Sequence, residues 1–95
     1  MSPRQLYGRL KADFDRLEQS NAQRGEWLQL SYRLIETTMA CQELVIEKQK
    51  VLLAYARGEA DAEAFRDARQ ESRDAIQVLD KLAELHQQIR WHLLS

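Results

Sequence analysis

The feature that most constrains this chain is a run of positions between residues 65 and 93 whose spacing alternates between three and four residues. These positions are Phe65, Ala68, Ser72, Ala75, Leu79, Leu82, His86, Ile89 and Leu93. Such spacing keeps one face of a helix along a continuous line, and its repetition over several heptads is typical of a left-handed coiled coil. The pattern predicts a long helix over residues 61–93 that packs along its whole length against another helix.

A matching helix is predicted over residues 22–57. Its apolar stripe consists of Trp27, Leu30, Leu34, Thr38, Cys41, Val45, Leu52 and Tyr55. Gly58 predicts its end, because a glycine just past a helix adopts the left-handed conformation at low cost. Its start is less defined. Ser20 and Gln23 have the spacing of a capping box, but Gly25 is an alternative breaking point.

The connection between these two helices is short, so we expect them to run antiparallel. Asp61 is a favourable N-cap for the second of them. With the loop centred near residues 59–60, the numbers of facing residues sum to about 119. This register predicts that Cys41 faces Leu79, that Leu34 faces His86 and that Lys48 meets Glu71.

Helical spacing of Leu6, Leu10, Phe14 and Leu17 predicts a shorter first helix over residues 4–19. The chain holds one proline and three glycines, too few for a turn-rich β fold. We therefore predict one all-α domain over residues 1–95. Its architecture is a long antiparallel, coiled-coil-like hairpin that the shorter N-terminal helix completes as a three-helix arrangement.

Two apolar triplets, Leu44-Val45-Ile46 and Val51-Leu52-Leu53, stand seven residues apart. A triplet spans about 200° of a helix, whereas one packed neighbour covers a stripe of roughly 100° or slightly more. The excess belongs to a second stripe on the same helix, formed by Leu28, Tyr32, Ile35, Met39, Ile46 and Leu53. We expect the first helix to cover the first four of these positions and to stop short of the last two.

The uncovered part near the hairpin tip is the predicted partner-binding site, which consists of Leu44, Ile46, Gln49, Val51 and Leu53. An exposed apolar patch of several hundred Å² on a protein surface usually marks a binding surface. Three interpretations remain open. The first helix could lie elsewhere and leave an ordinary core, the chain could pair with itself as a homodimer, or it could bind a different protein as an adaptor, escort chaperone or regulatory subunit.

The sequence contains few residues that are candidates for catalysis or metal binding. His86 and Cys41 occupy seam positions without the neighbours that a metal site or an activated thiol requires, so both are interpreted as core or core-edge residues. Lys48 is the one cation in the stripe of its helix. We predict no catalytic residue, no metal, no cofactor and no small-molecule substrate. The alternative is a small all-α enzyme that binds an anionic metabolite, for which Lys48 would be a contact.

The charge balance gives little support to nucleic-acid binding, because the net charge is −1 and phosphate-binding proteins usually carry a basic excess. A nucleic-acid-linked regulator is kept as a further alternative, and it would use the basic residues Arg4, Arg9, Lys11, Arg16 and Arg24. The N-terminal stretch lacks an apolar run of signal-peptide length, and no segment has the length of a membrane span. Together with a single cysteine, this favours a cytoplasmic location and no membrane partner.

Overall fold

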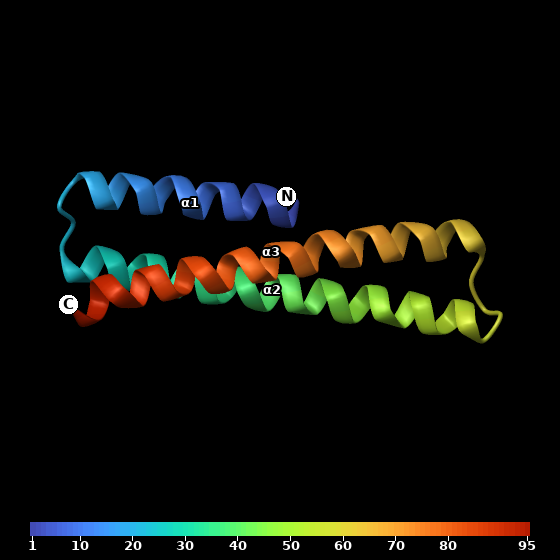
Figure 1. Cartoon of the computed structure of the whole chain (residues 1–95). Helices are drawn as coiled ribbons and strands as arrows, with labels where there is room; N and C mark the ends of the chain where they lie inside the picture. The colour runs from blue at the N-terminus through green and yellow to red at the C-terminus, as the bar shows by residue number, and fades with distance from the viewer.

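The computed structural model describes all residues from 1 to 95 and contains three helices and no strand. These are α1 (Pro3–Gln19), α2 (Arg24–Ala56) and α3 (Ala62–Leu94). The all-α fold class is confirmed, and each boundary lies within one or two residues of its predicted position. Helices α2 and α3 form a long antiparallel hairpin, and the shorter α1 lies beside one half of it (Figure 1).

Local signals at the helix ends explain these boundaries. Pro3 opens α1, and the Ser2 hydroxyl accepts a hydrogen bond from the Gln5 backbone N–H at 3.2 Å. At the start of α3, Asp61 accepts a hydrogen bond from the Ala64 N–H at 2.7 Å, as its predicted role as N-cap requires. Gly58 follows α2 with φ of 76°, a left-handed conformation that favours glycine. The predicted end of α2 is thereby confirmed.

Helix α2 begins at Arg24, two residues after the predicted start, and neither Ser20 nor Gly25 determines this position. Gln23 is the N-cap residue, and its backbone N–H donates to the Glu26 side chain at 3.1 Å. Glu26 also places negative charge in the first turn, where the helix dipole favours it. Gly25 lies inside this first turn and Ser20 closes α1, so the sharp turn falls on Asn21, with φ of 54°.

Three contacts fix the register of the hairpin. The Lys48 ammonium lies 2.9 Å from the Glu71 carboxylate, as predicted. Near the tip, the rings of Tyr55 and Phe65 are 4.5 Å apart, and near the opposite end Trp27 stacks on His92 at 4.0 Å. The residue numbers of these pairs sum to 119 or 120. The predicted antiparallel register therefore holds from one end of the rod, which is 55 Å long, to the other.

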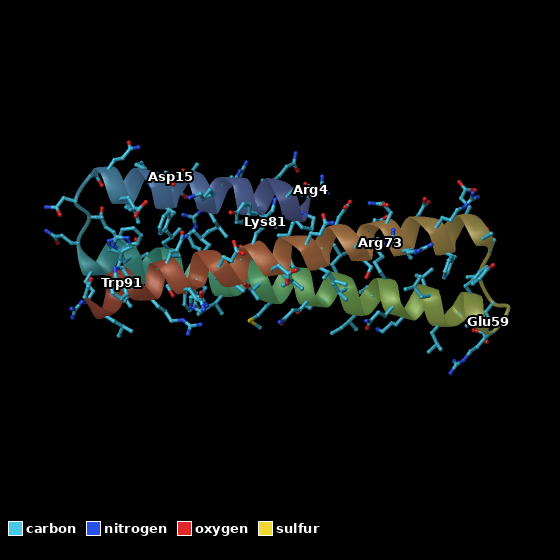
Figure 2. All side chains as sticks on the ribbon, in the orientation of Figure 1. Arg4, Asp15, Glu59, Arg73, Lys81 and Trp91 are labelled. Carbon is cyan, nitrogen blue, oxygen red and sulfur yellow. The ribbon has the colours of Figure 1, made fainter.

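The large buried side chains gather in the half of the hairpin that α1 covers. Leu10, Phe14 and Leu17 project from α1 into the groove between α2 and α3. The rest of this cluster comes from the two long helices: Trp27, Leu30, Leu34, Cys41, Val78, Leu82, Leu85 and Ile89. Ion pairs flank the cluster, with Arg33 at 2.7 Å from Asp13 and Arg4 at 3.0 Å from Asp74. Figure 2 shows Arg4 near the middle of the rod, where α1 begins.

The predicted placement of α1 is wrong. We expected it to cover Leu28, Tyr32, Ile35 and Met39, but these four side chains are between 42% and 66% exposed. Helix α1 lies instead in the groove on the other side, where its apolar residues contact two helices at once. Burial against two neighbours removes more apolar surface from water than burial against one, so packing of α1 in the groove is favoured over packing on α2 alone.

The same placement changes the face that α3 buries. The heptad spacing predicted Leu79 and His86 in the seam, but both are only half buried, whereas Val78 and Leu85 are 2% exposed. Val78 and Leu85 each lie one position before the predicted residue, which turns them toward α1. The predicted seam assumed that α3 packs against α2 alone. Because α3 also packs against α1, its buried face includes positions one residue earlier.

Candidate partner-binding face

One continuous row of α2 residues remains exposed along nearly the full length of the helix. We call it the α2 stripe, and its members are Leu28, Tyr32, Ile35, Met39, Gln42, Ile46, Gln49 and Leu53. The steps between them alternate between four and three residues, which is the heptad pattern of a coiled-coil seam. Every member is exposed, including six large apolar or aromatic side chains. Helix α2 thus carries two seams, and only one of them has a partner within the chain.

The α2 stripe faces away from α1. Leu30 and Arg33 of α2 lie against α1, next to Asp13 and Leu17. At about 100° per residue, Met39 lies about 180° around the helix from Leu30. The stripe runs for about 37 Å at 1.5 Å per residue. It therefore forms the underside of the hairpin, opposite the surface that α1 occupies.

Helix α3 adds a smaller apolar margin to this underside. Ile76 is 46% exposed, Leu79 is half buried and Ala83 is exposed. The helical positions of these residues place them next to the α2 stripe, on the side of α3 away from Val78 and Leu85. The underside is thus two helices wide, with apolar side chains from both.

The five residues predicted to bind a partner do not form one surface. Ile46, Gln49 and Leu53 belong to the α2 stripe, and Ile46 and Leu53 are 53% and 52% exposed. Leu44 and Val51 are half buried and lie on the other side of α2. Leu44 borders a shallow depression beside Pro3 and Arg4 at the start of α1. A single flat partner could contact the first group but not the second.

The sequence interpretation left five members out of the candidate surface: Leu28, Tyr32, Ile35, Met39 and Gln42. The signal was present, because the same alternating spacing continues through them. The first four were assigned to the contact with the first helix, and the placement of α1 releases them. The candidate face is therefore longer than predicted and is centred on the middle of α2 rather than on the tip.

Cys41, His86 and Lys48, the residues considered for chemical roles, lie at packed or ion-paired positions. Cys41 is 2% exposed within the core, and burial raises the pKa of its thiol, which favours the unreactive protonated form. Desolvation, with a smaller effect from the nearby Arg90, lowers the pKa of His86. Lys48 is engaged by Glu71.

An aromatic cluster closes the end of the rod where α1 turns into α2. Trp27 stacks on His92 with nearly parallel rings, and the Phe14 ring meets Trp27 edge-on at 5.4 Å. The His92 ring nitrogen lies 3.3 Å from the Glu18 carboxylate. Trp91 is 74% exposed and lies at the same end of the rod (Figure 2), where it borders a surface depression together with Phe14 and His92. Through Phe14 and Glu18, the cluster connects α1 to both long helices.

No group of three or more His, Cys, Asp or Glu side chains is placed to hold a metal ion. None of the three helices combines the length and the apolar composition needed to cross a bilayer. Comparisons with protein-family models, with curated proteins and with solved structures gave no match.

Proposed function

We propose that this protein is a non-enzymatic protein–protein interaction module and that the α2 stripe is its binding surface. An adaptor, an escort chaperone and a regulatory subunit all fit this description. The observation that supports the proposal is a complete heptad seam without a partner in the chain. Six large apolar side chains at regular spacing are costly to leave in water, and surface patches of this size mark interaction sites more often than not.

The form of the stripe also indicates the kind of surface it binds. A row of positions at heptad spacing fits a helix that packs nearly parallel or antiparallel to α2, with side chains interlocking as in a helical bundle. It does not provide the enclosed concavity that small ligands require. We therefore infer a helical protein surface as the binding partner.

The test replaces Ile46 and Leu53 together by glutamate. Both side chains are about half exposed, so the folded chain tolerates the charges, whereas a buried interface does not. We expect the wild type to associate in light scattering over a range of concentrations, and we expect Ile46→Glu/Leu53→Glu to be a monomer with unchanged helical circular dichroism.

The matched control is Gln29→Glu/Ala40→Glu. It adds the same charge to exposed positions of α2 outside the stripe, and we expect it to associate like the wild type. Two results would contradict the proposal. The Ile46→Glu/Leu53→Glu protein could unfold, which would make these residues ordinary core, or it could associate as strongly as an associating wild type does.

A further inference from the structure

We infer that the occupant of the α2 stripe is a second copy of this chain, packed underside to underside with its α2 antiparallel to the first. This inference rests on the proposed function and names the partner. In this arrangement α2 lies against α2 of the second copy, and α3 lies against α3. The two hairpins then form a four-helix core, and each α1 remains on the outside.

The stripe is complementary to its own reverse. A two-fold axis that lies between the two copies, at the level of Ala40 and Cys41, pairs residues whose numbers sum to 81. Leu28 then meets Leu53 of the second copy, and Ile35 meets Ile46 of the second copy. A two-fold interface requires each contact to occur twice with the roles exchanged, and these pairs satisfy that condition. The large aliphatic residues meet one another on both sides of the axis.

The two glutamines fit the same register. Gln49 lies opposite Tyr32 of the second copy, where the amide can hydrogen-bond to the phenol hydroxyl. Gln42 lies opposite Met39 of the second copy, a flexible and polarisable side chain that packs against irregular neighbours. A parallel pairing of α2 with α2 in register would instead bury each glutamine against its own copy. Polar residues inside a seam specify register and orientation, and in the antiparallel register the Gln49 amide gains the Tyr32 hydroxyl as its partner.

The same two-fold axis also determines how α3 pairs with α3 of the second copy. Residues that face each other within the hairpin sum to 119 or 120, so the axis passes α3 of each copy at the level of Leu79. Ile76 is then set opposite Ala83 of the second copy, a large residue against a small one. Such alternation lets two packed layers interdigitate.

The available area matches a stable dimer. An underside about 37 Å long and about two helix diameters wide offers roughly 650 Å² per chain. The two chains together then bury roughly 1,300 Å², within the usual range for a specific interface. Helix α1 does not obstruct the pairing, because it lies on the opposite face of the hairpin.

The test uses single cysteines in a Cys41→Ala background, which removes the one native thiol. Ile35→Cys and Ile46→Cys chains are prepared separately, mixed in equal amounts and oxidised. We expect a disulfide-linked dimer in the mixture and almost none in either chain alone, because only residues 35 and 46 face each other across the axis. The pair Gln29→Cys and Ala40→Cys, both outside the stripe, is the matched control and is expected to remain unlinked.

The outcomes separate this inference from the proposed function. Cross-linking of Ile35→Cys chains with themselves would indicate a parallel pairing and overturn the inference. A wild type that is monomeric at every concentration would overturn it as well. Association that Ile46→Glu/Leu53→Glu abolishes, but that yields no mixed cross-link, would overturn the antiparallel register while leaving the binding surface in place. The proposed function itself fails only if the glutamate variant unfolds or still associates as the wild type does.

A second variant sharpens the result. The proposed register brings Glu43 near Glu36 of the second copy, because these two numbers sum to 79, close to the 81 of facing pairs. This is a like-charge contact on the flank of the seam. Glu43→Gln is therefore expected to tighten the dimer about two-fold, as relief of a like-charge pair on a helix surface does. Weaker association would show that Glu43 faces a cation instead and would overturn the register.

Discussion

The two halves of the hairpin are held together in different ways. In the half that α1 covers, three helices enclose large side chains such as Phe14, Leu34 and Leu82, which are at most 2% exposed. In the tip half only two helices meet, and the buried residues there are the small Ala68, Ser72 and Ala75. Two helices alone cannot enclose a large side chain on all sides. The covered half therefore provides most of the stability, and the tip half depends on close helix approach and on the loop.

The largest expected effect compares a leucine in each half. Leu82 is fully buried, and we expect Leu82→Ala to lower the free energy of unfolding by about 2–5 kcal/mol, because the cavity is enclosed by three helices. Leu52 is half buried in the tip half, and we expect Leu52→Ala to cost less than about 2 kcal/mol. Urea denaturation followed by circular dichroism measures both. Equal losses would break the comparison.

The same comparison corrects the choice of core residue made from the heptad spacing. Leu79 was predicted to face Cys41 in the seam, but it is half buried at the edge of the cluster. We expect Leu79→Ala to destabilise the monomer clearly less than Leu82→Ala does, since water already reaches part of its side chain. A loss as large as that of Leu82→Ala at a concentration where the chain is monomeric would place Leu79 in the core after all.

A glycine-to-alanine substitution is expected to stabilise the protein in the covered half and to destabilise it at the tip. Gly8 lies inside α1 with open space around its Cα, so Gly8→Ala is expected to stabilise the protein by about 0.5–1 kcal/mol. Gly58 closes α2 at the tip with φ of 76°, and Gly58→Ala is expected to cost about 1–2 kcal/mol because of the left-handed backbone. Thermal melts of the two variants test this. A neutral Gly58→Ala would mean that the loop adopts another conformation.

The smallest effect concerns pH and the edge of the covered half. The pKa of His86 is lowered in the folded chain, mainly by desolvation, from an ordinary value of 6.5. The unfolded chain therefore binds a proton at this residue more readily, so stability should fall as the pH drops below about 6.5. His86→Gln should reduce this slope in melts recorded from pH 7.5 downward. An unchanged slope would assign the acid sensitivity to other groups.

The helices and their ends could be predicted from the sequence because residues close to them in the chain determine them. Asp61 caps α3, Gly58 ends α2, and the alternating spacing of apolar residues identifies both long helices. The short loop between α2 and α3 determines that they run antiparallel, and this in turn sets the contact between Lys48 and Glu71. Each of these features depends on neighbours in the chain or on one turn of known length.

The position of α1 could not be obtained in the same way. Helix α2 offers two apolar seams of similar quality, and the spacing of Leu10, Phe14 and Leu17 is compatible with either of them. The choice depends on how well these three side chains fill a groove that α2 and α3 create together, with Val78 and Leu85 as its far wall. The apolar pattern of one helix does not predict the shape of a groove between two other helices.

The sequence by itself determined that this chain is helical, the bounds of its helices to within two residues, and that α2 carries more apolar surface than one neighbour can cover. Only the tertiary structure decided which surface is left over. Helix α1 gains more by entering the groove between two helices than by lying on one, since burial scales with the apolar area removed from water. Its choice of side exposes the α2 stripe from Leu28 to Leu53 and so creates the face through which we propose that two copies meet.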